Sequence, residues 1–400
     1  MLQITTVLPK RVLWAFVAAV LVSALIVLQR GQRLVPVVTH HPAKKAPAPT
    51  NILDDINNST LGFEKILVVG LPSRTDRRDG MTLQAALSNL DIRFVDGVVG
   101  SNVLEKAVPK PQNKEHLRGP GLGSWRGHMN AIQKVVRRNL SSALILEDDC
   151  DWDISIRQQL RDFARSAHAL TQPLQSSPGS YADPTYPQPS NSSPPTVPDI
   201  PFDKLPATVP PKSSPYGEGW DVLWVGHCGM HFPSKDNKAM PKGRVVRYND
   251  MTVPEMRHLW SLNVPFTLAQ KYPNHTRAVH HAQDGVCTLG YAVSQRGAQK
   301  ILYHVGLKEV TDPFDILLKL FCDGSARRST DMHNCLTTQP GLFHHHRTVG
   351  HHSEASDIGD HGDGFRDNAY TDMVRWSVRL NAIELMNGGT SFHDQFPDDS

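Results

Sequence analysis

Hydrophobic and polar positions follow two alternating patterns along residues 64–386. Short apolar runs bounded by polar residues predict buried strands, which we place at residues 65–71, 92–99, 143–146, 221–225 and 288–293. Between these runs, apolar residues recur at helical spacing. This predicts helices over residues 81–90, onward from Ser124 as a cap, and from Ser294 through about His304. Strand–helix alternation of this kind is typical of an α/β domain with a mostly parallel sheet and flanking helices.

One segment interrupts this pattern. Residues 173–215 are so rich in proline and serine that neither a helix nor a central strand is expected there. The segments on either side look like halves of one α/β fold. We therefore predict a disordered insertion at residues 173–215 within a single domain, residues 64–386, which is followed by a tail at residues 387–400.

The N-terminal region carries a different signal. Residues 12–28 are apolar except for Ser23, and such a helix would be about 26 Å long at 1.5 Å per residue, enough for a thin bilayer. We predict a cytoplasmic tail (residues 1–11), a transmembrane signal anchor (12–28) and a Pro- and Lys-containing stem (29–63). A cleaved signal peptide is the alternative, although no clear small-x-small cleavage site follows the apolar run.

Several N-x-S/T sequons favour a lumenal body, because such sequons are used only there. They lie at Asn57, Asn58, Asn139, Asn191 and Asn274. We therefore expect a single-pass type II membrane protein of the Golgi or endoplasmic reticulum, with a lumenal catalytic domain.

Composition narrows the function classes. The 400 residues include 42 Lys and Arg against 39 Asp and Glu, a net charge of +3, so no basic surface predicts nucleic-acid binding. Five cysteines are too few for a disulfide scaffold. In an oxidising lumen Cys322 is close enough in sequence to pair with Cys335, and Cys228 with Cys287 is a further option. Cys150 would then be a small buried residue.

The stretch ALILEDDCDWD, residues 143–153, is the most informative part of the sequence. A buried strand that ends in carboxylates places them at the edge of a parallel sheet where ligands bind. Successive side chains of a strand alternate, so we expect Glu147, Asp149 and Asp151 to share one side and Asp148 to face the other. Oxygen ligands of this kind suit Mg²⁺ or Mn²⁺ held together with a diphosphate. Solvated acids that end a strand are the alternative.

Six segments in order resemble glycosyltransferase family 25, the lipooligosaccharide and procollagen galactosyltransferase group. They are LVVGLPSRTDRRDGM (67–81), GLGSWRGHMNAI (121–132), ALILEDD (143–149), LGYAVSQRGAQKIL (289–302), Pro313-Phe314-Asp315, and QPGLFHHHRTVGHHSEASDIG (339–359). The resemblance implies a GT-A (Rossmann-like) fold, a UDP-sugar donor, Mn²⁺ or Mg²⁺, and transfer with inversion. Ser124 and Gly127 stand where the family usually has Cys and Ser, which leaves the acceptor open.

The resemblance also implies roles for individual residues. Asp148 and Asp149 would hold the metal and diphosphate, with Glu147 in support or as an alternative ligand. One of His344–His346, for which we choose His346, would complete the metal site. Donor contacts are expected from Arg74, Arg77 and Arg78, which follow the first strand. Asp315 is the candidate general base and Asp284 the second. The alternatives are a solvated basic loop, an Asp that only caps a helix, and a surface loop rich in histidine.

These inferences together predict a metal-dependent, inverting glycosyltransferase. It would transfer a sugar, expected to be galactose, from a UDP-sugar to a glycan or glycoprotein acceptor. One rival is a catalytically silent protein that keeps the fold to bind carbohydrate or a partner. Another is a metal-dependent hydrolase built on the histidines at positions 344–346.

Overall fold

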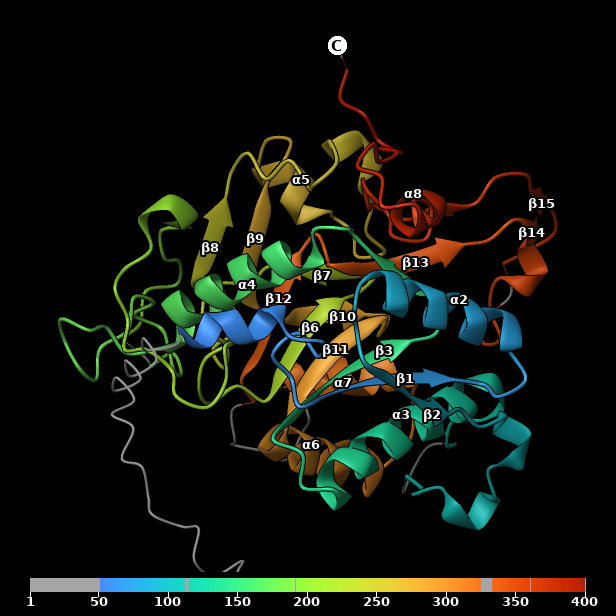
Figure 1. Cartoon of the computed structure of the whole chain (residues 1–400). Coiled ribbons are helices and arrows are strands. Elements are labelled where there is room, and N and C mark those ends of the chain that lie inside the picture. Colours follow the sequence, from blue (N-terminus) through green and yellow to red (C-terminus); the bar gives the residue numbers. More distant parts are fainter. Residues whose placement is uncertain (1–50, 112–114, 191, 325–332, 360, 400) are drawn as a thin grey trace, which may run out of the picture. The chain divides into compact units, whose positions relative to one another are not determined.

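The computed structural model describes residues 51–111, 115–190, 192–324, 333–359 and 361–399 (Figure 1). The predicted cytoplasmic tail, the predicted anchor at residues 12–28 and most of the predicted stem lie outside these residues. Within the described ranges, the search for a helix with the length and apolarity needed to cross a bilayer finds none.

A nine-stranded sheet forms the centre of the described part, with the strand order β2-β1-β3-β11-β6-β12-β9-β8-β5. β1 runs parallel to β2 and β3, and β6 runs parallel to β12, whereas β11 and β9 are antiparallel to both of their neighbours. Seven of the nine strands, all except β11 and β9, therefore point in the same direction, and the expected mixed α/β fold with a largely parallel sheet is confirmed. The strands are β1 (Lys65–Gly70), β2 (Ile92–Asp96), β3 (Ser142–Glu147), β5 (Ile200–Pro201), β6 (Val222–Gly226), β8 (Arg244–Arg247), β9 (Arg277–His281), β11 (Gly290–Ser294) and β12 (Cys335–Gln339).

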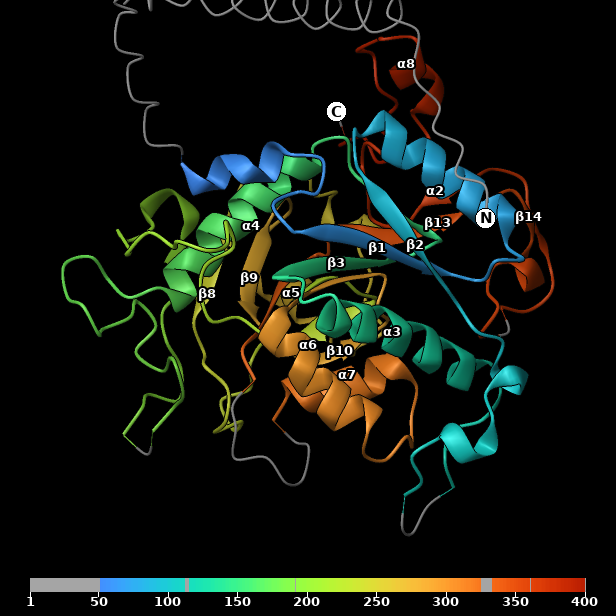
Figure 2. The same ribbon diagram turned by 60° about the horizontal axis from the view of Figure 1, so that its bottom comes forward.

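Helices cover both faces of the sheet (Figure 2). Side chains of β1 alternate between two hydrophobic clusters, with Ile66 and Val68 in one and Leu67 and Val69 in the other. The first cluster is completed by residues of α2 and α4, the second by residues of α3, α6 and α7. These helices are α2 (Thr75–Leu87), α3 (Gly119–Arg137), α4 (Ile156–Thr171), α6 (Gln295–Ile301) and α7 (Phe314–Cys322).

Three smaller sheets and several short helices complete the architecture. β4 of the sheet β16-β13-β4 directly follows β3 in the chain, and the pairs β10-β7 and β14-β15 form two further sheets. The strands are β4 (Cys150–Trp152), β7 (Gly229–His231), β10 (Gln283–Val286), β13 (Phe343–Arg347), β14 (Gly350–His351), β15 (Phe365–Arg366) and β16 (Tyr370–Thr371). The remaining helices are α5 (Thr267–Lys271), α8 (Ala382–Met386), η1 (Ile52–Asn57), η2 (Gly100–Asn102), η3 (Glu105–Ala107), η4 (Phe202–Lys204), η5 (Met256–His258), η6 (Leu302–Gly306) and η7 (His352–Glu354).

Helix starts differ most from the sequence predictions. The predicted cap at Ser294 is confirmed, since its hydroxyl accepts a hydrogen bond from the Gly297 amide at 3.0 Å. Ser124, by contrast, lies inside α3, which begins at Gly119. Pro120 occupies the first turn of α3, where its missing N–H and fixed φ are tolerated. The helix thus starts within a Gly-Pro-Gly stretch that composition alone reads as a turn.

Both disulfides considered from the sequence are present. Cys228 is bonded to Cys287 and Cys322 to Cys335, while Cys150 is a buried free thiol. The first disulfide ties the segment after β6 to the residue that follows β10, beside the cavity described below.

The Pro/Ser-rich segment contains little helix or strand, but part of it packs on the sheet rather than being disordered throughout. Its residues Ile200–Pro201 form β5, which pairs with β8 at the sheet edge. Asp183 is buried, and its carboxylate accepts the Gly243 amide at 2.7 Å. The buried Thr185 hydroxyl accepts the Lys242 amide at 2.8 Å. Composition did not reveal these contacts, because each involves one residue packed against a distant strand.

Candidate active site

A cavity of about 620 Å³ lies at the carboxyl ends of β1, β2 and β3. Its walls come from residues 69–71 at the end of β1, residues 97–101 after β2, the start of α3, residues 147–149 at the end of β3, and residues 356–359. Parallel strands that end together leave a crevice of this kind, where α/β proteins bind their ligands.

Glycines let the cavity walls approach closely. A Cβ atom on Gly70 would lie 2.0 Å from Asp148 Oδ2, and one on Gly100 would lie 1.9 Å from the Gly119 carbonyl oxygen. A Cβ on Gly123 would lie 2.3 Å from the Val98 carbonyl oxygen. Larger residues at these positions would push apart the segments that form the cavity.

Glu147, Asp149 and His345 form a group that could hold a metal ion. One candidate ligand atom from each lies within 4.8 Å of the other two. Glu147 is the last residue of β3, Asp149 lies in the turn before β4, and His345 lies on β13. β13 pairs with β4 in antiparallel register, so that His345 is opposite Cys150. Carboxylate oxygens and an imidazole nitrogen suit Mn²⁺.

His346, the expected metal ligand, lies on the other side of β13. Its Nδ1 is 3.0 Å from the Thr371 hydroxyl and 3.8 Å from Asp151 Oδ2. Successive side chains of a strand face opposite sides, so His345 and His346 cannot both face Asp149. The structure therefore groups Asp149 with Glu147 and His345, rather than with Asp148 and His346.

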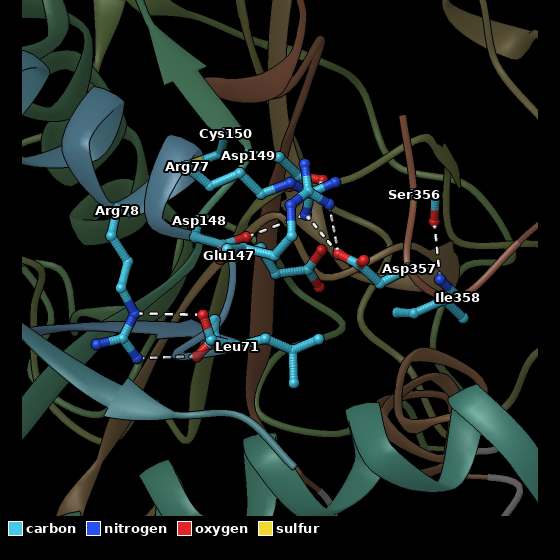
Figure 3. A network of polar contacts seen from close by, with 12 residues as sticks. Leu71, Arg77, Arg78, Glu147, Asp148, Asp149, Cys150, Ser356, Asp357 and Ile358 are labelled. Carbon is cyan, nitrogen blue, oxygen red and sulfur yellow. Dashed lines mark hydrogen bonds and ion pairs between the residues drawn. The ribbon is translucent and has the colours of Figure 1, made fainter. Parts of the chain in front are cut away.

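Arg77 joins the acidic residues to the opposite wall of the cavity (Figure 3). Its Nη1 lies 3.1 Å from Asp148 Oδ1, 3.1 Å from Asp149 Oδ2 and 3.7 Å from Asp357 Oδ2. Its Nη2 donates to the Ala355 carbonyl at 2.9 Å. One guanidinium thus bridges the turn after β3 and the segment that contains Asp357.

Burial and neighbouring charges give Asp148 and Asp149 different pKa values. Burial raises the pKa of Asp148 to about 7, and the neighbouring Asp149 carboxylate adds to this rise. Burial also opposes ionisation of Asp149, but Arg77 and His345 outweigh it, so the pKa of Asp149 is lowered. For Arg77, burial alone would lower the pKa, yet the Asp149 and Asp148 carboxylates raise it overall. Asp149 is therefore the ionised carboxylate beside a permanent cation.

In the acidic turn, two buried carboxylate oxygens have no hydrogen-bond partner among the described residues, namely Asp148 Oδ2 and Asp149 Oδ1. Unpaired buried oxygens of this kind are costly unless a ligand or proton satisfies them. Together with the donor set of Glu147, Asp149 and His345, they make the residues present here a fit for a divalent cation.

Arg74 and Arg78 are less involved than Arg77. Arg74 binds Asp76 at 2.8 Å and Asp357 at 2.7 Å, and it does not line the cavity. Arg78 Nε donates to the Leu71 carbonyl at 3.3 Å (Figure 3). Its Nη2 donates to the Gly70 carbonyl at 3.1 Å and to Asp96 at 2.5 Å. Arg78 therefore fixes the backbone at the end of β1, and Arg77 alone of the three arginines faces the cavity.

Of the two candidate bases, only Asp315 lines the cavity. Its Oδ2 accepts the Cys287 amide at 2.9 Å and its Oδ1 accepts the Ile316 amide at 2.9 Å. Asp284 lies outside the cavity, where its carboxylate pairs with Lys319 at 2.8 Å and His231 at 3.2 Å.

Asp151 does not share a side with Glu147 and Asp149. The strand is interrupted by a turn at Asp148 and Asp149, so the alternation expected from β3 does not continue. The buried Asp151 carboxylate accepts Gln84 Nε2 at 2.6 Å and the Thr371 hydroxyl at 2.7 Å. Asp151 thus connects α2 to β16 in the core.

Sequence reasoning missed three features of the site. His345 was grouped with its neighbours, and its position follows only from the register of β13. Asp357 reaches Arg74 across 283 residues of sequence, which no local pattern reveals. The glycines of GPGLGSWRG, residues 119–127, were a usable signal, because clustered glycines at the start of a helix are typical of close backbone approach to a ligand.

The part of the chain that matches a known protein family includes much of this site. Residues 63–176 match the model for glycosyltransferase family 25 (LPS biosynthesis protein). The resemblance to this family is therefore confirmed for that part of the chain. The matched residues include β1, the three arginines, α3 and the acidic turn.

Some similar proteins are named as galactosyltransferases, and one is named as inactive. Procollagen galactosyltransferase 1-B of Xenopus laevis is 27% identical over 132 residues, 30% of this chain and 21% of that protein. Procollagen galactosyltransferase 2 of Mus musculus is 26% identical over 112 residues, 25% of this chain and 18% of that protein. Inactive glycosyltransferase 25 family member 3 of Homo sapiens is 25% identical over 122 residues, 28% of this chain and 20% of that protein. The matches span about a fifth of these relatives.

Proposed function

We propose that this protein is a metal-dependent glycosyltransferase of the GT-A type that transfers a sugar, expected to be galactose, from a UDP-sugar to a glycan or glycoprotein acceptor. The observation that carries the proposal is the convergence of Glu147, Asp149, His345 and Arg77 on one cavity at the ends of parallel strands. The match of residues 63–176 to a glycosyltransferase family supports the same reaction class.

The acidic turn is the proposed diphosphate end of the cavity. Glu147, Asp149 and His345 would hold Mn²⁺ or Mg²⁺, which when bound supplies positive charge to the leaving diphosphate. Arg77 contributes a second, permanent charge on the same side of the cavity. The start of α3 adds backbone amides at its N-terminus, an arrangement that favours phosphate groups.

Asp315 is the proposed general base. An inverting transfer needs a group that accepts the proton of the acceptor hydroxyl as the new bond forms. Asp315 reaches the cavity from the start of α7, and the Cys287 amide fixes its carboxylate. It comes from a different element than the acidic turn, since Asp315 belongs to α7 and the turn follows β3.

The secretory pathway is the proposed location. Two disulfides join residues of the domain, and disulfides persist in oxidising compartments. The lumen of the endoplasmic reticulum or Golgi provides such an environment, and there the sequons listed above would be used. The apolar residues 12–28 would serve as a type II membrane anchor.

A silent binding protein is the second candidate. It is favoured by the similarity to the human relative named as inactive. Both functions predict binding of a nucleotide sugar, and only the transferase predicts its turnover.

The test uses residues 51–400 secreted from a eukaryotic host and a panel of nucleotide sugars with Mn²⁺. Release of nucleoside diphosphate is measured with candidate acceptors (free sugars, glycans and collagen-like peptides), with and without a chelator. The transferase predicts chelator-sensitive release from a UDP-sugar that is lost in Asp149→Asn and Asp315→Asn. Donor binding without release in every acceptor mixture would support the silent binding protein instead.

A further inference from the structure

We propose that His128 is a positioning residue that, together with Thr288 and Tyr291, aims the Glu147 carboxylate at the metal position. This inference rests on the proposed metal site and names residues that would set its affinity. The comparisons assign no role to any of the three.

Two side chains contact the same oxygen of Glu147. The Thr288 hydroxyl donates to Glu147 Oε1 at 2.7 Å, and His128 Nε2 lies 3.3 Å from the same atom and 3.4 Å from the Thr288 hydroxyl. Both contacts come from elements outside β3, since His128 lies on α3 and Thr288 precedes β11. Because they fall on Oε1, they fix the rotation of the carboxylate and leave its other oxygen to bind a ligand.

Tyr291 sets the tautomer of His128. The Tyr291 hydroxyl lies 3.0 Å from Nδ1 and can donate to it, which makes Nδ1 an acceptor. The ring proton is then on Nε2, the nitrogen that faces Glu147 Oε1 and the Thr288 hydroxyl. Tyr291 and His128 are both buried, with exposed fractions of 0% and 2%. The resulting chain of donors runs from Tyr291 through His128 to Glu147.

Packing holds the His128 ring in this orientation. The ring stacks on Phe314 at a centroid distance of 4.4 Å and an interplanar angle of 8°. Phe314 directly precedes Asp315, the proposed base. His128 therefore lies near Glu147 and packs against the residue that precedes Asp315. Outer residues that orient a metal-binding carboxylate alter metal affinity by about 10–100-fold when they are removed.

The experiment measures the Kd for Mn²⁺ directly, by calorimetry on the secreted domain without nucleotide. The matched pair is His128→Asn and His128→Gln. Both variants lose the stacked ring, but the longer glutamine amide can place a donor where Nε2 stood. We expect Asn to weaken Mn²⁺ binding by about tenfold or more and Gln to retain most of the affinity.

Two conservative variants test the other donors. Thr288→Val keeps the shape of the side chain and removes the closest donor, so it should weaken Mn²⁺ binding by about tenfold. Tyr291→Phe should also weaken it. Tyr216→Phe is the control, because that buried hydroxyl donates to the Leu61 carbonyl away from the cavity. It should leave the Kd unchanged.

The outcomes separate this inference from the proposed function. Wild-type Mn²⁺ binding that stays the same in folded Thr288→Val and Tyr291→Phe would overturn the positioning role alone. Equal weakening by His128→Asn and His128→Gln would also overturn it, because packing rather than the donor would then matter. A wild-type protein that binds no Mn²⁺ would overturn the metal site and this inference together. If the His128 variants do not fold, the Thr288 and Tyr291 variants still decide.

Discussion

Arg77 offers a quantitative test of the site's electrostatics. Arg77→Met removes the cation that lies 3.1 Å from both Asp148 and Asp149 and keeps much of the side-chain volume. At an effective dielectric constant of about 20, each of these contacts corresponds to roughly 5 kcal/mol of Coulomb attraction. Without Arg77, Asp149 would therefore take up a proton rather than stay ionised and unpaired.

The free energy needed to protonate Asp149 sets an upper limit on the loss of stability in Arg77→Met. An aspartate with an unfolded-state pKa near 3.9 resists protonation by about 4 kcal/mol at pH 7 and by about 1.5 kcal/mol at pH 5. Asp148 adds little, since its pKa is already raised to about 7. The lowered pKa of Asp149 contributes stability above its unfolded value that is lost as the pH falls. The difference in free energy of unfolding between wild type and Arg77→Met should therefore decrease from about 4 kcal/mol at pH 7 to about 1.5 kcal/mol at pH 5.

The assay is urea unfolding of the secreted domain, followed by tryptophan fluorescence with a chelator present. Arg78→Met is the matched control, because Arg78 pairs with the largely exposed Asp96. Its effect should be smaller and nearly independent of pH. A loss for Arg77→Met that does not change with pH, or that equals the loss for Arg78→Met, would refute the reasoning.

Three further predictions concern other parts of the structure. Burial lowers the pKa of His280 to about 3, so the unfolded state binds more protons below about pH 6.5 and the wild type loses stability as the pH falls. In urea unfolding, His280→Gln should make the free energy of unfolding fall less steeply, by about 1.4 kcal/mol per pH unit between about pH 6 and pH 4. An unchanged pH dependence would contradict the buried neutral imidazole. Gly70→Ala would place a Cβ 2.0 Å from Asp148 Oδ2, so it should destabilise the domain by about 1–3 kcal/mol and weaken Mn²⁺ binding. The control Gly359→Ala, which has open space around its Cβ, should do neither. Equal effects of the two variants would count against the close approach of Gly70 to Asp148. Replacing Cys228 and Cys287 by serine removes a disulfide between residues 59 positions apart and should lower the free energy of unfolding by about 4 kcal/mol. Removing the disulfide between Cys322 and Cys335, which are 13 positions apart, should lower it by about 3 kcal/mol. The reverse order would show that loop length does not govern the effect.

Buried strands and one helix cap could be predicted because their signals are local. The runs that became β1 and β3 are apolar on successive residues, as strands covered on both faces must be. The Ser294 cap lies directly before a helical pattern. The start of α3 could not be placed, since Gly-Pro-Gly is compatible with either a turn or a first helical turn.

The composition of the site was predicted better than its geometry. The carboxylates after β3 follow from the strand that carries them, and Asp149 and Arg77 do meet in the cavity. The choice of His345 over His346 depends on how β13 pairs with β4, a register that the sequence does not specify. Asp151 fell outside the site because a two-residue turn reset the alternation. Asp357 depends on a contact between distant segments, which only the folded chain defines.

Binding of UDP to the secreted domain tests the central claim most directly, because it does not depend on the acceptor or on turnover. The measurement is a calorimetric titration with Mn²⁺ and with a chelator, for wild type and Asp149→Asn. If the cavity is a joint site for a metal and a nucleoside diphosphate, Mn²⁺ should tighten UDP binding at least tenfold, about 1.4 kcal/mol, in the wild type and not in the variant. UDP affinity that is the same with Mn²⁺ and with chelator, or that is unchanged in Asp149→Asn, would contradict the account.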